Sequence, residues 1–415
     1  MKKKSAFCLM LLMLATSICG GMANAAHNVE FSDISAHWAK ADIQSAITAG
    51  YVAGYPDGTF RPNANVSRAE FLAIVTRAST LPNNGEKDFF DDVPEQHWAA
   101  DAVHKGLGMG FVEAEDFGKT FAPDQALTRA EMAKWLVSGL AVSDPSFVQA
   151  LEDTKNTLLP FTEYYRDGFD SEDIPYIAVA LGTGLLNGFP DGTFGPDQPT
   201  TRAEVVALLS RYLNVEGTKA EQYRALNELR EVGTTGTNMV SLANATWTYD
   251  FEGNIAPITQ IFNKEIIFSN QAATAKIHKI IVVNFSKGLE MKGRGVYAPM
   301  FYYVTPVQSD DRYYVFVELS VTPLRDITST TTFSGGINQI TGSRLDYIKS
   351  VQYAMNTIVM DRGVYGINSG DYVRLQDYFK KGTTRTLWTY TVRGKNHHPV
   401  SVGTTDGIRG GYVLH

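Results

Sequence analysis

The chain has 415 residues, and its 44 Asp and Glu outnumber its 37 Lys and Arg, which gives a formal net charge of −7. A net negative charge argues against a general affinity for nucleic acid or for any other acidic polymer. Any recognition of an anionic ligand must therefore be local, through a few placed cations, and no nucleic-acid partner is expected.

The first 25 residues read as a secretory signal peptide. Three lysines at positions 2–4 precede an apolar run over residues 6–18, and Ala23-Asn24-Ala25 is a small-x-small cleavage site. We expect cleavage after Ala25. Lipidation of Cys19 is the alternative, but Ile18 is a poor residue to precede a lipidated cysteine.

The same segment contains the only two cysteines, Cys8 and Cys19, so the mature chain can form no disulfide. Elsewhere no run approaches the roughly 18 apolar residues of a membrane span. We therefore expect a secreted protein that stays at the cell surface by binding.

One short pattern then occurs three times: Ser67-Arg68-Ala69-Glu70, Thr128-Arg129-Ala130-Glu131 and Thr201-Arg202-Ala203-Glu204. Each is a capping box that opens an apolar periodic run, so three helices are predicted to begin in the same way. The arginine is unexpected, because a cation in the first turn faces the positive end of the helix dipole at a cost of a few tenths of a kcal/mol to about 1 kcal/mol. Some compensating interaction must favour it at each site.

The repetition extends upstream of each box. The turn Gly54-Tyr55-Pro56-Asp57-Gly58-Thr59-Phe60 returns as Gly188-Phe189-Pro190-Asp191-Gly192-Thr193-Phe194, while the middle copy keeps only Thr120-Phe121-Ala122-Pro123. Farther upstream, an aromatic-x-Asp element ending at Asp33 or Asp92 precedes His-Trp, with Trp38 and Trp98. The third copy offers Asp167 and has Glu172 in place of the tryptophan. Each unit reads helix, loop, helix, and none is long enough to bury its apolar face alone.

At these residues the chain resembles the S-layer homology (SLH) domain family, present as three tandem repeats from about Val29 to Leu213. The resemblance implies an all-α pseudo-trimer bundle that anchors exported bacterial proteins non-covalently to an acidic cell-wall polysaccharide, often one carrying pyruvyl ketals. It also implies S-layer neighbours as partners and the cell wall as location. The residues we expect to contact the polysaccharide are Asp33, Trp38, Gly54, Asp57, Arg68, Asp92, Trp98, Arg129, Asp167, Gly188, Asp191 and Arg202.

The residue types agree with this interpretation. A helix N-terminus presents unpaired N–H groups and a positive dipole end, and an arginine beside it supplies a planar fork for a carboxylate. Tryptophans could offer flat faces to sugar rings, and the glycine-rich turn lets backbone approach a ligand. In the alternative interpretation the arginines pair with Asp33, Asp92 and Asp167, and the tryptophans are core residues.

After residue 213 the repeat ends. Residues 218–232 are predicted as a helix, and residues 233–237 as a flexible break, so residues 215–237 read as a helical linker and hinge. We expect domain limits at 1–25 for the signal peptide, at 28–82, 86–143 and 160–214 for the repeats, and at 238–415 for a C-terminal domain.

The C-terminal domain is predicted to be β-rich, which makes the whole chain α+β. Strands are expected at Lys279–Phe285, Val296–Val304 and Arg312–Pro323, and a helix at Arg344–Val359. In Arg312–Pro323 one face carries Tyr313, Val315, Val317 and Leu319, and the other carries Tyr314, Phe316, Glu318 and Ser320. We expect a mostly antiparallel sheet.

Sequence motifs point to no cofactor and no metal. His278 stands in an apolar run and reads as a strand-face histidine, and His397-His398 with His415 has no third ligand at a fixed spacing. No nucleophile motif is present. A non-enzymatic anchored surface protein is therefore favoured over a wall-anchored glycan or peptide hydrolase. A cleft lined by two facing acids, about 5 to 10 Å apart, would reverse that preference.

Overall fold

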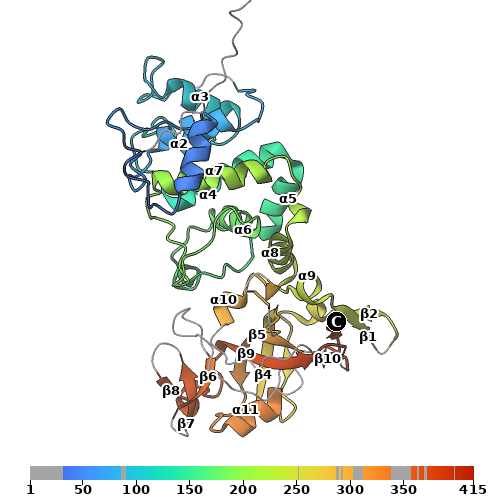
Figure 1. The fold of residues 1–415 in the computed structure, drawn as a ribbon. Coiled ribbons are helices and arrows are strands. Elements are labelled where there is room, and N and C mark those ends of the chain that lie inside the picture. Colours follow the sequence, from blue (N-terminus) through green and yellow to red (C-terminus); the bar gives the residue numbers. More distant parts are fainter. Residues whose placement is uncertain are drawn as a thin grey trace, which may run out of the picture.

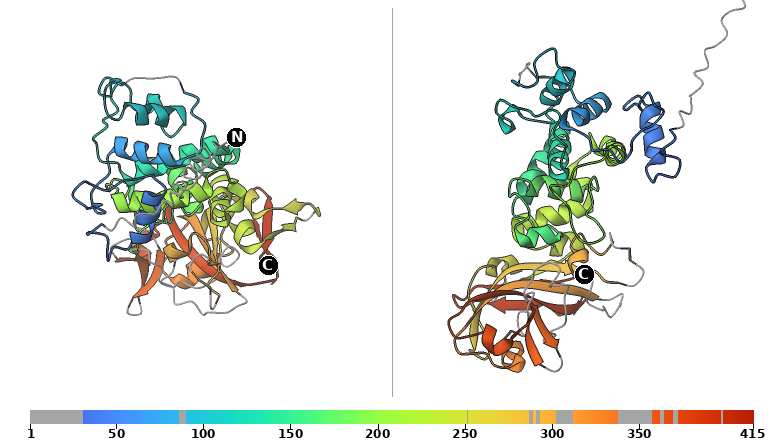
Figure 2. Two further views of the ribbon diagram at one scale, coloured as in Figure 1. Left: turned by 45° about the horizontal axis from the view of Figure 1, so that its top comes forward. Right: turned by 90° about the vertical axis from the view of Figure 1, so that its left-hand side faces the viewer.

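The computed structural model describes residues 31–85, 90–250, 252–286, 289–290, 293–301, 312–337, 357–361, 364–368, 372–396 and 398–415. The predicted signal peptide lies outside the described residues. Figure 1 shows a helical N-terminal half above a β-rich C-terminal half, and Figure 2 shows the same arrangement from two further sides. The prediction of a mixed α+β chain is confirmed.

The N-terminal half contains pairs of short helices joined by loops. The helices are α1 (Lys40–Thr48), α2 (Arg68–Ala78), α3 (Ala100–Gly108), α4 (Arg129–Ser143), α5 (Pro145–Thr154), α6 (Ile174–Gly182) and α7 (Arg202–Val215). Helices α2, α4 and α7 begin with the predicted capping boxes: a Ser or Thr oxygen accepts from the third N–H of the helix, and the Glu accepts from the cap residue. Caps of this kind contribute about 0.5–2 kcal/mol each.

A ring of three backbone hydrogen bonds joins the repeats just before these caps. The N–H of Val66 donates to the carbonyl of Thr200 at 2.9 Å, that of Thr200 to Leu127 at 2.9 Å, and that of Leu127 back to Val66 at 2.9 Å. The three residues are fully buried. Each repeat thus contributes one donor and one acceptor to the same centre.

Helix packing follows the same cycle. The second helix of each repeat packs on the first helix of another: α2 on α3, α4 on α6, and α7 on α1. The apolar face of each helix pair is therefore completed by a neighbouring repeat, as expected for units too small to bury a core alone.

Two helices complete this half beyond the repeats. Helix α5 follows α4 directly, with Asp144 as its cap and Pro145 in its first turn, and it was not anticipated from the sequence. Helix α8 (Arg224–Thr235) packs on α5 and α6.

The expected flexible break at residues 233–237 is wrong. Residues 233–235 form the last turn of α8, and Gly236 ends it with φ 79°. A Cβ on Gly233 would lie 2.0 Å from the carbonyl oxygen of Asp153 in α5, so glycine here permits close helix packing rather than flexibility.

The C-terminal half is built on two sheets. Seven strands lie in the order β3-β4-β5-β9-β6-β7-β8, and four in the order β10-β11-β1-β2. Named strand pairs are antiparallel except β6 with β9, which confirms a mostly antiparallel domain. The strands are β1 (Thr246–Tyr249), β2 (Ile255–Ala256), β3 (Ile266–Ile267), β4 (Ala273–Val283), β5 (Arg312–Pro323), β6 (Thr357–Asp361), β7 (Val364–Asn368), β8 (Tyr372–Arg374), β9 (Arg385–Gly394), β10 (Val400–Gly403) and β11 (Arg409–Val413); the helices are α9 (Met239–Ala243), α10 (Ala298–Phe301), α11 (Thr330–Ile337) and α12 (Leu375–Tyr378).

Strand β5 has the predicted bounds, and its two faces enter different cores. Tyr313, Val315, Val317 and Leu319 pack in a core of the C-terminal half alone. Tyr314 and Phe316 pack in a core that runs without interruption into the helical repeats. The two halves therefore share buried side chains.

Two other predictions differ from the structure. The strand predicted at Val296–Val304 is wrong where the chain is described, because residues 298–301 form α10. Most of the helix predicted at Arg344–Val359 lies outside the described residues, and residues 357–359 belong to β6.

Residues 236–238 cover the outer edge of β4. The N–H of Ile280 donates to the carbonyl of Gly236 at 3.0 Å. The buried side-chain amide of Asn238 donates to the carbonyl of Val282 at 2.9 Å and accepts from its N–H at 2.7 Å. An asparagine side chain thus replaces a neighbouring strand on an edge that would otherwise leave backbone groups unpaired.

Replacing Asn238 tests this attachment. Asn238→Ala should lower the free energy of unfolding by about 2 to 4 kcal/mol, because it leaves a buried N–H and a buried carbonyl without partners. Asn227→Ala is the control, since that amide makes one surface hydrogen bond to the carbonyl of Glu221. Urea titration of both variants measures the difference, and equal small losses would contradict this role.

Candidate functional site

The three arginines of the repeated pattern occupy the first position of α2, α4 and α7, and each guanidinium points into another repeat. Arg68 donates to the carbonyl of Phe121 at 2.8 Å and pairs with Glu131. Arg129 donates to the carbonyls of Phe194 at 2.9 Å and Asn187 at 3.1 Å, with Glu204 at 3.6 Å. Arg202 donates to Phe60 at 3.1 Å and Ala53 at 3.0 Å.

These contacts give the arginines a structural role that neither sequence interpretation anticipated. Arg129 and Arg202 are only 5% and 8% exposed. Burial lowers the pKa of Arg129, and the carboxylate of Glu204 opposes that shift. The compensation for a cation in the first turn is therefore a set of hydrogen bonds between repeats.

The helix N-termini are also paired, contrary to expectation. In α2 the N–H of Arg68 donates to the carbonyl of Gln125 at 2.9 Å, and that of Ala69 donates to Pro123 at 3.1 Å. The same two positions of α4 donate to Gln198 and Pro196, and those of α7 donate to Ala64 and Pro62. The first-turn groups that would bind an anion are occupied by the preceding loop of another repeat.

The predicted acids fasten loops rather than the arginines. Asp33 accepts from the N–H groups of Phe60 and Arg61, and Asp92 accepts from Phe121 and Ala122. Burial alone would raise the pKa of Asp33, but these hydrogen bonds hold it below its usual value.

In the third repeat the corresponding acid is Glu163, not Asp167. Glu163 accepts from the N–H groups of Phe194 and Gly195, both at 2.9 Å. Asp167 instead ends a short 3-10 helix, residues 162–166, with φ 54°. The equivalence is found by counting back from the turn, where Phe161-Thr162-Glu163 matches Phe31-Ser32-Asp33.

The predicted turn residues are accounted for within the fold. Asp57 and Asp191 cap their turns by accepting from Thr59 and Thr193. Hydrogen bonds from Thr59 and Arg61 lower the pKa of Asp57 to about 2. A Cβ on Gly54 would lie 1.9 Å from the ring of Phe31, and one on Gly188 would lie 2.4 Å from Phe161, so both glycines allow packing of those rings.

The two tryptophans are large apolar side chains that face solvent. Trp38 is 65% exposed and Trp98 is 60% exposed, so they are not core residues. Each lies beside the preceding histidine, with ring centroids 5.5 and 5.8 Å apart. Histidine Nδ1 accepts the N–H two residues on, at 3.2 Å in both repeats, which fixes the approach to the following helix.

Trp98 lines a groove between α2 and α3 with a volume of about 240 Å³. Arg77 enters it from the end of α2, and Lys105 enters from α3. Asp101 pairs with Lys105 at 2.9 Å, so the groove keeps one net positive charge. The remaining lining residues are Ala73, Thr76 and Ala102. Arg77 and Lys105 were not among the contact residues predicted from the sequence. For Lys105 a signal was present, because Trp98, Asp101 and Lys105 are spaced to lie on one face of a helix.

The corresponding surfaces at the other two repeat junctions have different chemistry. Between α4 and α6, Lys134 stands where α2 has Ala73; it pairs with Asp116 at 2.8 Å and lies 5.9 Å from the ring centroid of Tyr176. Between α7 and α1, position 211 keeps the arginine, whose guanidinium donates to the carbonyl of Leu185 at 3.2 Å.

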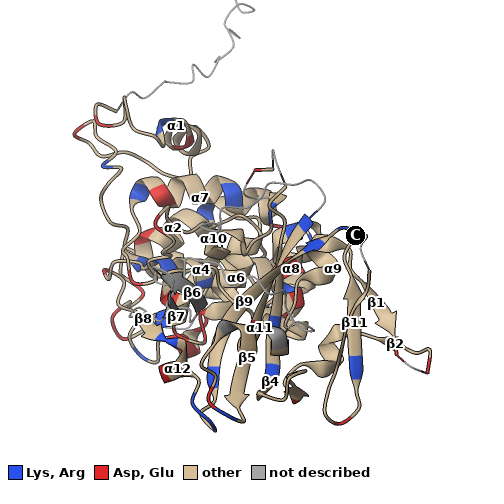
Figure 3. Ribbon diagram, turned by 90° about the horizontal axis from the view of Figure 1, so that it is seen from below, with Lys and Arg blue, Asp and Glu red and all other residues tan. Residues whose placement is uncertain are grey.

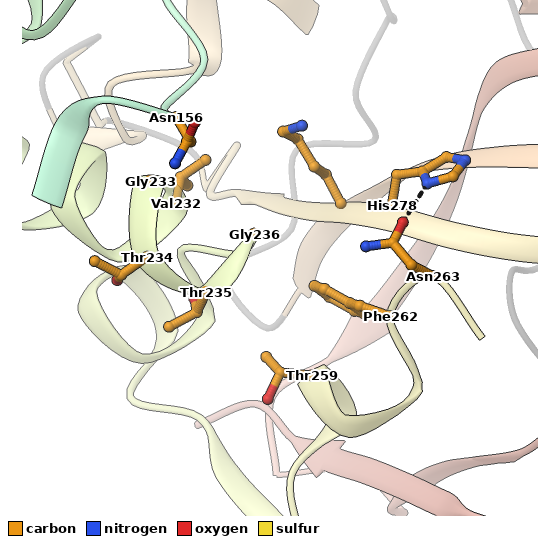
Figure 4. Close-up of a pocket in the computed structure, with 11 residues that line it drawn as sticks. Asn156, Val232, Gly233, Thr234, Thr235, Gly236, Thr259, Phe262, Asn263 and His278 are labelled. Carbon is orange, nitrogen blue, oxygen red and sulfur yellow. Dashed lines mark hydrogen bonds between the residues drawn. The ribbon is translucent and has the colours of Figure 1, made fainter.

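A second hollow, of about 420 Å³, lies where α8 meets β4 (Figure 4). His278 lies beside this hollow. Its ring atom Nδ1 is hydrogen-bonded to Oδ1 of Asn263 at 2.6 Å, and its Nε2 to Oγ of Ser320 at 3.0 Å. Burial lowers the pKa of His278. No Asp or Glu lines this hollow. Within the described residues no cluster of three or more His, Cys, Asp or Glu could hold a metal, and no helix combines the length and apolarity of a membrane span.

Known proteins resemble this chain in the helical half. The family model described as S-layer homology domain matches residues 30–72, 89–133 and 165–206.

Similar proteins include cell surface glycoprotein 1 of Acetivibrio thermocellus (32% identical over 41% of this chain and 8% of that protein) and amylopullulanase of Thermoanaerobacterium thermosulfurigenes (29%; 45% and 10%). The S-layer protein of Bacillus licheniformis is 28% identical over 59% of this chain and 27% of that protein. The chain spans less than a third of the length of each.

The burial of the arginines gives a direct test. Arg202→Ala should lower the free energy of unfolding by about 2 to 5 kcal/mol, because the buried carbonyl of Phe60 and the part-buried carbonyl of Ala53 lose their donors. Arg77→Ala removes an exposed arginine and should change it by less than about 0.5 kcal/mol. Denaturant unfolding of the two variants compares them, and an unchanged stability for Arg202→Ala would refute the structural role.

Proposed function

The chain carries three tandem S-layer homology repeats, and from this we propose that it is an exported bacterial surface protein anchored to the cell wall. The anchor is non-covalent, and its ligand is an anionic wall polysaccharide, with a pyruvylated sugar as the preferred acidic unit. Relatives named as S-layer and cell surface proteins support the location.

The observation that carries the proposal is the exposed Trp98 beside two cations. An indole face packs against the C–H face of a pyranose ring, and Arg77 and Lys105 lie on the two walls of the same groove. A guanidinium matches a carboxylate with two parallel hydrogen bonds, so a pyruvyl ketal would be held between the cations. This is local recognition of the kind that an acidic protein requires.

Among the predicted contact residues, we assign direct contact to Trp38 and Trp98. Arg68, Arg129 and Arg202, with Asp33, Asp92 and the turn residues, act on the ligand by holding the loops that shape the grooves. The proposal includes a pseudo-threefold unit from the repeats at 28–82, 86–143 and 160–214, supported by the cyclic contacts of α2 with α3, α4 with α6 and α7 with α1.

The C-terminal half, 238–415, we propose as a binding or structural domain displayed by this anchor. The relatives include both surface proteins and an amylopullulanase, so the anchor alone does not decide between display and catalysis. The enzyme alternative requires two facing acids in a cleft. The hollow at β4 has no acid in its lining and so offers no such pair.

Groove variants test the anchoring proposal. Trp98→Ala and Arg77→Ala should each weaken binding to purified walls by about tenfold, which corresponds to about 1.4 kcal/mol. Lys134→Ala should change binding by less than about twofold, because the α4–α6 junction has Glu172 in place of the tryptophan and an acid there repels an anionic ligand. Co-sedimentation with purified walls measures the affinities.

Trp38→Ala serves as the matched variant at the α7–α1 junction, and its loss should not exceed that of Trp98→Ala. Loss of binding in Lys134→Ala, with full binding retained in Trp98→Ala, would place the ligand elsewhere.

A further inference from the structure

The two halves of the chain carry opposite charge. Residues 26–237 contain 16 Lys and Arg against 31 Asp and Glu, whereas residues 238–415 contain 18 against 13. Figure 3 shows Lys and Arg on loops at the ends of strands in the C-terminal half. Opposite charges on separate domains allow one copy to attract another, independently of any wall polymer.

The positive charge gathers on two adjacent turns, here called the basic tip: Arg325, Lys380, Lys381 and Arg385. The N–H of Gly382 donates to the carbonyl of Pro323 at 2.8 Å, and the N–H of Ile327 donates to Phe379 at 3.0 Å, so the turns lie side by side.

The cations of the basic tip are available to a partner. All four residues are exposed, and within the described residues none is in an ion pair. The turns also hold one acid, Asp326, which accepts from the N–H of Lys381 at 2.8 Å, so the tip keeps a net positive charge. Arg385 lies 5.1 Å from the ring centroid of Tyr378, which holds its guanidinium in place. Leu324, 45% exposed, adds an apolar contact beside them.

A complementary surface lies at the α4–α6 junction, here called the acidic face: Glu113, Asp116, Asp170, Glu172 and Asp173. Burial raises the pKa of Asp173, and repulsion from Asp170 and Glu172 adds to the rise. Lys134 pairs with Asp116 and its charge also lowers the pKa of Asp173, so this one cation offsets part of the charge of the five acids and the face stays negative. This junction lacks the tryptophan and the open cationic groove of the α2–α3 junction, which makes it a poor site for an anionic polymer.

We propose that the basic tip of one copy docks on the acidic face of a second copy. The two surfaces belong to different parts of the chain, so the contact is heterologous and can continue from copy to copy as a chain or lattice. We favour the acidic face over an acidic polymer as the partner of the basic tip for two reasons. Contact with the tip relieves the repulsion among the acids of the face. The tip also presents an apolar residue among its cations.

Sedimentation velocity on the mature full-length protein tests the proposal. The protein should associate at 20 mM salt, and its association constant should fall at least tenfold at 500 mM salt. Reversing the charge of the basic tip with Arg325→Glu, Lys380→Glu and Lys381→Glu should lower the association constant at least tenfold at 20 mM salt. Reversing the charge of the acidic face with Glu113→Lys, Asp170→Lys and Glu172→Lys should lower the association constant by the same factor. Combining both sets of substitutions in one chain should restore association.

The matched control is Arg312→Glu with Lys395→Glu, which changes exposed or half-exposed cations at the opposite end of β5 and β9 and should leave association unchanged. Wall co-sedimentation at a protein concentration where the chain is monomeric separates this proposal from anchoring: tip variants should bind walls like the unaltered protein. A protein that stays monomeric at low salt, or a combined variant that stays monomeric, overturns the proposal. Loss of monomer wall binding in the tip variant would overturn it in favour of a polymer ligand.

Discussion

The second helix of every repeat begins on the backbone of another repeat, and the rest of the helical half depends on this arrangement. Val66, Leu127 and Thr200 exchange backbone hydrogen bonds in a ring, and the next two N–H groups of each helix donate to a loop of a neighbouring repeat. The guanidinium at the first helical position, which is buried in Arg129 and Arg202, then donates to a carbonyl of the same loop. Helix initiation and assembly of the repeats are therefore one process, since no repeat can complete its helix start alone.

This constraint determines where a ligand can bind. A free helix N-terminus attracts anions, but here its donors and the adjacent arginine are consumed inside the fold. In our proposal the ligand binds instead in the grooves between helices, where residues at non-repeated positions differ. Alanine at position 73 leaves room between α2 and α3, whereas lysine at position 134 fills the α4–α6 junction and pairs with Asp116. Three similar frameworks thus support three chemically different surfaces, one of them acidic.

The sequence predicted what depends on local patterns. Three capping boxes located three helix starts, and alternation over Arg312–Pro323 predicted both the bounds of β5 and the separation of its faces. It failed where partners come from distant segments. The destinations of Arg68 and Arg202 lie about 50 and 140 residues away, Gly233 reads as a flexible residue until Asp153 is seen beside it, and Glu163 is found only through the turn that it fastens.

We propose that a tryptophan and two cations between repeats recognise carboxylate groups on the wall polymer. The most direct measurement is the affinity of the unaltered protein and of Arg77→Ala for intact walls and for walls stripped of pyruvyl and other acidic substituents. Stripping should weaken binding of the unaltered protein by about tenfold and have little further effect on Arg77→Ala, because both changes remove the same interaction. Equal affinity of the unaltered protein for stripped and intact walls would contradict this proposal.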